Sequence, residues 1–117
     1  MSMLTRFESN DKLSRVVVHG DSVYLSGLTP SDRTGGIRDQ VAQVLGKIDH
    51  HLTQAGTDRS RILFVQIWLK DIARDFDEMN RVWSRWLSNT PAPARATGEV
   101  ALAHPDILVE MIVTATR

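Results

Sequence analysis

The chain has 117 residues, and its 14 basic and 14 acidic side chains give a formal net charge of zero at neutral pH. This length suits one domain spanning residues 1–117, and the balanced charge argues against an interface for nucleic acid or an anionic membrane. Cysteine is absent, which excludes disulfides, thiolate nucleophiles and thiolate-bound metals.

The N-terminal third of the chain predicts three short strands. Residues 4–7 favour the first strand, and a polar loop follows it. Residues 16–19 and 22–25 predict a β-hairpin, because Gly20-Asp21 supplies the residue types that a two-residue turn requires. Ser26-Gly27 ends the hairpin, and a loop over residues 30–36 comes next.

Two helices are predicted on either side of one buried strand. Apolar residues keep helical spacing over 37–55, and Gly56 is a natural stop. Residues 62–69 are rich in β-branched and aromatic side chains, which predicts a buried strand. A second helix is predicted over residues 75–87, with an apolar side made of Phe76, Met79, Val82, Trp83, Trp86 and Leu87.

The last quarter of the chain alternates with the period of a β-strand, over residues 95–102 and again over 107–115. His104-Pro105-Asp106 is turn chemistry, so we expect the two strands to pair as a hairpin. Three pairs then lie opposite each other: Arg95 and Thr114, Thr97 and Ile112, and Glu99 and Glu110. All the polar groups would fall on one face of the hairpin, and the other face would be apolar.

The element order is therefore β-β-β-α-β-α-β-β, which predicts an α+β domain with both helices on one face of a single sheet. The other face keeps apolar residues beside its charges: Ala101, Leu108 and Ile112. Because two helices can cover only one face, we expect the exposed face to be an association surface and the protein to be a homotrimer.

Several motifs resemble the RidA (YjgF-type) family of enamine/imine deaminases. The match rests on Pro93-Ala94-Arg95, on Thr97 and Glu99, and on Val109-Glu110-Met111, whose glutamate follows the arginine by fifteen residues. Positions outside these motifs also match: Gly20, Ser26, Gly27, Pro30, Gln40, Leu45, Gly56 and Asn80. The resemblance implies a chorismate-mutase-like fold and a trimer with a cleft at each subunit interface.

The resemblance also implies a set of site residues. Arg95 would hold the carboxylate of a 2-imino acid, the tautomer of an enamine such as 2-aminoacrylate, because a guanidinium matches a carboxylate with two parallel donors. Glu110 would orient the attacking water, with Thr97 as the third catalytic residue. Ser26, Gly27 and Asn80 would help to bind the substrate. No cofactor and no metal are implied, because an imine is already electrophilic.

Several departures from the family pattern indicate a divergent branch, among them Asp11-Lys12 in place of a Gly-Pro pair. Leu13 stands where the best-characterised members have a tyrosine, Thr97 where they have a cysteine, and Leu28 where a glutamine is common. A trimer that binds small carboxylates without catalysis is therefore the alternative function. A ribonuclease or translation inhibitor is a further alternative, and the neutral charge argues against it.

The remaining sequence features predict neither a metal site nor a membrane-spanning segment. His50 and His51 are adjacent on a predicted helix and should point about 100° apart, so we expect no shared metal. No apolar run approaches a membrane span, and no signal-peptide pattern opens the chain. We therefore expect a cytoplasmic protein whose partner is a small imino or oxo acid.

Overall fold

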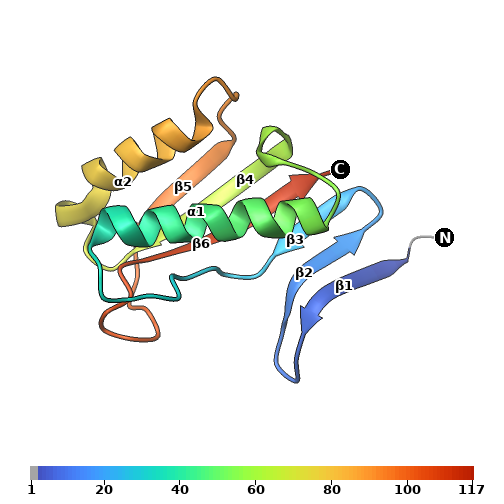
Figure 1. The fold of residues 1–117 in the computed structure, drawn as a ribbon, viewed down its shortest axis with the longest axis horizontal. Coiled ribbons are helices and arrows are strands. Elements are labelled where there is room, and N and C mark those ends of the chain that lie inside the picture. The colour runs from blue at the N-terminus through green and yellow to red at the C-terminus, as the bar shows by residue number, and fades with distance from the viewer. Residues whose placement is uncertain (1–2) are drawn as a thin grey trace.

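The computed structural model describes residues 3–117 and has the predicted order of elements, with one short 3₁₀ turn added before β4 (Figure 1). The strands are β1 (Leu4–Ser9), β2 (Ser14–His19), β3 (Ser22–Leu25), β4 (Ile62–Leu69), β5 (Ala94–Glu99) and β6 (Val109–Thr116). The helices are α1 (Ile37–Gln54) and α2 (Ile72–Leu87).

All six strands form one sheet in the order β1-β2-β3-β6-β4-β5. Neighbouring strands are antiparallel except β4 and β5, which are parallel and are connected through α2. Gly20 takes a left-handed φ of +60° in the β2–β3 turn, so this predicted hairpin is confirmed.

The predicted hairpin of residues 95–102 and 107–115 is wrong. β4 lies between β5 and β6 and pairs with both, so the two C-terminal strands never touch as neighbours. Glu99 lies beside Leu69, whereas Glu110 lies beside Trp68. The residues around Pro105 form a turn, so the chain changes direction there. A turn does not determine which strand the following segment pairs with.

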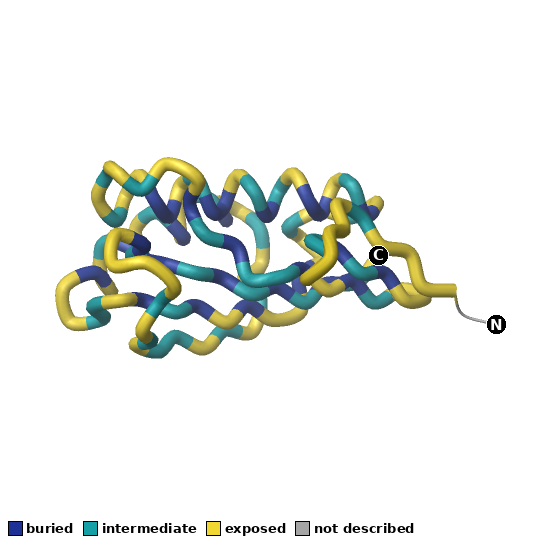
Figure 2. The backbone as a smooth tube through the Cα atoms, turned by 90° about the horizontal axis from the view of Figure 1, so that it is seen from below, coloured by how far each residue is buried: buried dark blue, intermediate teal, exposed yellow. Residues whose placement is uncertain are grey.

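The apolar face of the sheet carries both helices and the core. In Figure 2 the buried positions lie between the helical layer and the sheet. Val65, Ile67 and Leu69 of β4 are fully buried there, as are Val109 and Met111 of β6. From α1 the core receives Val41, Val44, Leu45, Ile48 and Leu52, which repeat every three or four residues.

The second helix begins three residues earlier than its apolar pattern predicts. The Asp71 carboxylate accepts a hydrogen bond from the backbone N–H of Arg74 at 3.1 Å and caps the first turn. Met79, Trp83 and Leu87 are buried as expected. Phe76 is instead 36% exposed, because it lies at the flank of the helix rather than on the face that contacts the sheet. No helix within residues 3–117 is long and apolar enough to cross a membrane.

Candidate functional site

Arg95 lies under α2 at the edge of the sheet. It pairs in register with Val65 of β4, so its side chain projects to the face that the helices cover. Its guanidinium carbon Cζ is 5.5 Å from the centroid of the Trp83 ring of α2, a cation–π contact. Among residues 3–117, no side-chain hydrogen bond or ion pair is made by Arg95, and its burial lowers the pKa of the guanidinium. A half-buried cation without a carboxylate partner is a favourable place for an anionic ligand.

Two more polar groups near this edge lack a partner within the described chain. Thr97 Oγ1 and Asn80 Oδ1 are buried and form no hydrogen bond. Thr97 follows Arg95 on the same face of β5, and Asn80 precedes Trp83 by three residues on α2. Buried polar atoms are usually hydrogen-bonded, so two unpaired acceptors beside an unpaired arginine indicate a binding site.

Glu99 does not join this group as a free carboxylate. Its Oε1 accepts the backbone N–H of Ile72 at 3.1 Å, at the first turn of α2. A carboxylate is favourable there because the helix N-terminus carries unpaired N–H groups and partial positive charge. We therefore assign Glu99 to the positioning of α2 rather than to the neutralisation of Arg95.

Glu110 lies on the opposite face of the sheet, with Gly27. Leu28 and Met111 form an isolated antiparallel bridge, with N–H···O distances of 2.8 and 3.0 Å, which holds residues 26–28 against β6. A Cβ atom on Gly27 would collide with Glu110 Oε2, so a larger residue there requires this carboxylate to move. Burial raises the pKa of Glu110, and Ser26 Oγ is the third buried acceptor without a partner in residues 3–117.

The structure thus divides the predicted site residues into two groups. Arg95, Thr97 and Asn80 lie between β5 and α2, whereas Glu110 and Gly27 lie on the face without helices. The expectation that Arg95 and Glu110 share a face is wrong, because Val65 and Ile67 of β4 align with Arg95 and Thr97 while Trp68 aligns with Glu110. Within one chain, the two groups therefore do not face the same ligand.

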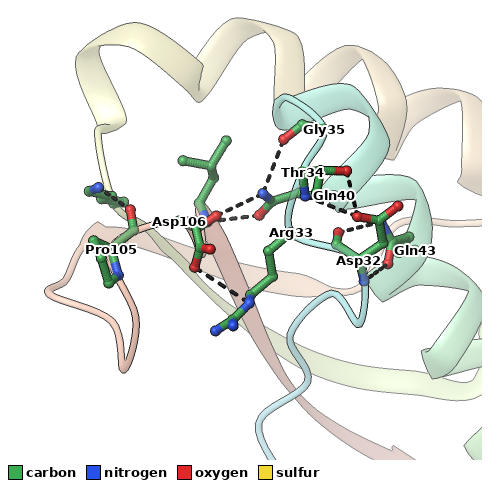
Figure 3. A network of polar contacts seen from close by, with 10 residues as sticks. Asp32, Arg33, Thr34, Gly35, Gln40, Gln43, Pro105 and Asp106 are labelled. Carbon is green, nitrogen blue, oxygen red and sulfur yellow. Dashed lines mark hydrogen bonds and ion pairs between the residues drawn. The ribbon is translucent and has the colours of Figure 1, made fainter.

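A buried amide holds the segment before β6 (Figure 3). Gln40 of α1 is fully buried, and its Nε2 donates to the carbonyls of Gly35 at 3.2 Å and Asp106 at 2.9 Å. Its Oε1 accepts the backbone N–H of Leu108 at 2.8 Å. These three bonds connect the start of α1 to the loop that delivers Glu110.

Trp83 contacts Arg95, although the sequence favours a core position for it and offers the border of the cleft as the alternative for Trp83 or Trp86. The helical spacing of Trp83 fits a core position, and it is 5% exposed. Nothing in the sequence pairs it with Arg95, because that contact depends on α2 crossing over β5. The signal that could have indicated it is the position of Trp83 one turn after Asn80 on the same helix.

Two helices over one face of a six-stranded mixed sheet define a compact α+β domain. The family model described as Endoribonuclease L-PSP matches residues 3–117. A RutC family protein of Haemophilus ducreyi is 38% identical over 113 residues, which cover 97% of this chain and 96% of that protein. The chain therefore belongs to the YjgF/RidA/RutC family.

Two further relatives agree with this assignment. The crystal structure of a YjgF family member from Neisseria meningitidis has a TM-score of 0.94 and 34% identity, covering 98% of this chain and 95% of that one. The 3-aminoacrylate deaminase RutC of Acinetobacter baylyi is 34% identical over 95 residues, or 76% of this chain and 74% of that enzyme.

Proposed function

We propose that the protein is a hydrolytic deaminase of small 2-imino or enamine acids, which it converts to 2-oxo acids and ammonia. The observation that carries this proposal is the half-buried Arg95, which is stacked on Trp83 and has no carboxylate partner within residues 3–117. Its fork of donors suits the carboxylate of such a substrate. The similarity to a protein named as a 3-aminoacrylate deaminase supports an unsaturated amino acid as the substrate class.

The opposite placement of Arg95 and Glu110 favours a cleft shared by two subunits. Arg95, Thr97 and Asn80 of one subunit would bind the carboxylate, and Glu110 beside Gly27 of its neighbour would hold water. The exposed apolar side chains on the face without helices support such an assembly: Tyr24 is 48% exposed and Phe64 is 38% exposed. We propose a homotrimer as the assembly that completes the site.

The chemistry requires only water and proton transfers. Water oriented by Glu110 adds through its oxygen to the imine carbon, and the imine nitrogen takes up a proton, which gives a tetrahedral carbinolamine. The carbinolamine C–N bond then breaks as its hydroxyl loses a proton, releasing ammonia and leaving the 2-oxo acid. Thr97 and Ser26 offer hydroxyls with free hydrogen-bonding capacity in this region.

The test is ligand binding and turnover in Arg95 variants. Removing one partner of a desolvated charge pair costs about 2–5 kcal/mol, so Arg95→Ala should weaken pyruvate or 2-oxobutyrate binding from about 30-fold to several thousand-fold. Arg95→Lys should recover only part of this affinity, because an ammonium lacks the planar fork. Arg59→Ala is the matched control, since Arg59 stacks on Trp86 but is paired with Asp49.

Calorimetry would supply the affinities, and turnover would be followed with 2-aminoacrylate generated in situ. Equal affinity in wild type and a folded Arg95→Ala protein would overturn the carboxylate site. Binding that depends on Arg95, without accelerated loss of 2-aminoacrylate, would instead identify a non-catalytic carboxylate binder.

A further inference from the structure

A second group of chemically capable side chains lies far along the sheet from Arg95, where β1 approaches α1. Glu8 Oε2 lies 3.4 Å from His50 Nε2 and 3.4 Å from His51 Nδ1. One ligand atom from each of these three residues lies within 4.8 Å of the others. They line a pocket of about 240 Å³ together with Arg15 and Lys47.

The two histidines converge in spite of their adjacency. Their side chains leave α1 in different directions, and the ring centroids are 5.0 Å apart with an interplanar angle of 61°. They nevertheless meet one carboxylate, because His50 presents Nε2 and His51 presents Nδ1. We expected adjacent helical histidines to diverge because of the directions of their rings. Each ring can present either of its two nitrogens, however, so diverging rings can still approach the same carboxylate.

The backbone of Glu8 is shaped to reach these rings. Glu8 has φ of +51°, a left-handed conformation that is uncommon for a residue with a side chain. Phe7 packs on the core on the helix side of β1, so an extended residue after it would point away from the helices. The left-handed turn directs the Glu8 carboxylate toward α1 instead, and such distortions often accompany functional positions.

The two carboxylate–imidazole spacings fit a tetrahedral metal. Zn²⁺ binds imidazole nitrogen and carboxylate oxygen at about 2.0–2.2 Å, which places neighbouring tetrahedral ligands about 3.3–3.5 Å apart. The two Glu8–histidine distances of 3.4 Å fall in this range. Two histidines and a glutamate form a known zinc donor set, with water as the fourth ligand. We propose that Glu8, His50 and His51 form a binding site for a divalent transition metal, Zn²⁺ first among them.

Residues around the site affect how tightly it would bind a metal ion. His51 is 5% exposed and its Nδ1 is 2.8 Å from Gln54 Oε1, so metal binding at that nitrogen replaces this hydrogen bond. Lys47 lines the same pocket, and its Nζ donates to the carbonyl of Thr29 at 2.7 Å. Arg15 and Lys47 repel a cation, which lowers the affinity without removing the ligands. The metal would connect the N-terminal strand to α1.

The experiment titrates tag-free, chelator-treated protein with Zn²⁺ in competition with a chromophoric indicator. We expect one Zn²⁺ per chain and a thermal midpoint that rises with Zn²⁺ concentration. Glu8→Gln and His51→Ala should each weaken binding by about 100-fold or more, because loss of an outer-shell partner alone costs about 10–100-fold. His19→Ala and His104→Ala are the matched controls and should bind as wild type does.

Two further variants keep the proposal falsifiable if the buried His51 proves important for folding. His50→Ala removes a ligand whose side chain is 63% exposed, so the fold should persist while Zn²⁺ affinity falls. Lys47→Met should tighten Zn²⁺ binding, because it removes a repelling charge and keeps a long, unbranched side chain. Equal Zn²⁺ affinity in wild type and His50→Ala, or weaker affinity in Lys47→Met, would overturn the site.

Discussion

The Arg95 guanidinium carbon lies 5.5 Å from the centroid of the Trp83 ring, and no carboxylate within residues 3–117 pairs with it. A second arginine–tryptophan contact, between Arg59 and Trp86 of the same helix, has a distance of 4.6 Å. The two contacts differ in that Arg59 also pairs with Asp49 at 2.7 Å. The aromatic face therefore helps to position a free cation at one contact and a paired cation at the other.

This difference predicts that Trp83→Leu weakens carboxylate binding more than Trp86→Leu does. A cation–π contact is worth about 0.5–2 kcal/mol, so Trp83→Leu should reduce pyruvate affinity by about 2- to 30-fold. Trp83 is buried and Trp86 is partly buried against the same core, so each variant loses a large side chain and serves as the other's control for stability. Calorimetry on the folded variants measures the effect, and equal losses of affinity would contradict a positioning role for Trp83.

Glu110 should make stability depend on pH in a defined direction. Burial raises the pKa of Glu110 above its ordinary value of 4.5. Its contribution to stability is therefore fully present below that value and is lost as the pH rises through the higher folded-state pKa. Glu110→Gln should gain stability relative to wild type between pH 4 and pH 7, as measured by urea unfolding. A constant difference between the two proteins across this range would show that Glu110 does not titrate in this way.

The same substitution should impair turnover more than binding. Glu110 is proposed to orient water in the transition state, and glutamine cannot accept a proton in that role. We expect kcat for 2-aminoacrylate to fall in Glu110→Gln with little change in pyruvate affinity. An increase in KM at unchanged kcat would instead indicate a substrate-binding residue.

A side chain at Gly27 should displace the Glu110 carboxylate. A Cβ atom at Gly27 would collide with Glu110 Oε2, so Gly27→Ala must displace the carboxylate or the segment that the Leu28–Met111 bridge holds. We expect a loss of turnover close to that of Glu110→Gln. Gly46→Ala is the matched control, because its Cβ meets nothing within 4 Å and alanine in a helix interior stabilises by about 0.5–1 kcal/mol. Wild-type turnover in Gly27→Ala would show that the close approach does not matter.

Gln40 should be important for stability. Gln40→Leu leaves the carbonyls of Gly35 and Asp106 and the N–H of Leu108 without this partner. These hydrogen bonds are partly buried and the Gln40 side chain is fully buried, so urea unfolding should show a loss of about 1–3 kcal/mol. Gln43→Leu, one turn later, removes exposed hydrogen bonds to Asp32 and should cost much less. Similar losses in the two variants would contradict this assignment.

The proposed trimer can be tested with two phenylalanines of similar exposure. Phe64 on the face without helices is 38% exposed, and Phe76 on α2 is 36% exposed. Phe64→Glu should disrupt the assembly, and Phe76→Glu should leave it intact, because only the first lies on the proposed association surface. Light scattering gives the masses, and a monomeric wild type at micromolar concentration would remove both the trimer and the shared cleft.

Local sequence patterns determined which residues are helical, which are extended and which face of each strand is apolar. The strand over residues 62–69 was predicted with its observed limits, and Val109, Met111, Val113 and Ala115 are buried as their alternation indicates. These features follow from spacing within one segment, where side-chain direction repeats every two or every 3.6 residues. The family motifs likewise contain the residues that surround the candidate site.

Only the tertiary structure decided how those segments combine. The insertion of β4 between β5 and β6 places Arg95 under the helices and Glu110 on the other face, because a shift of pairing partner changes which residues align. The approach of Glu8 to His50 and His51 likewise depends on the left-handed backbone at Glu8 and on β1 reaching α1. Strand partners and such long-range contacts are set by burial across the whole domain, which no local period encodes.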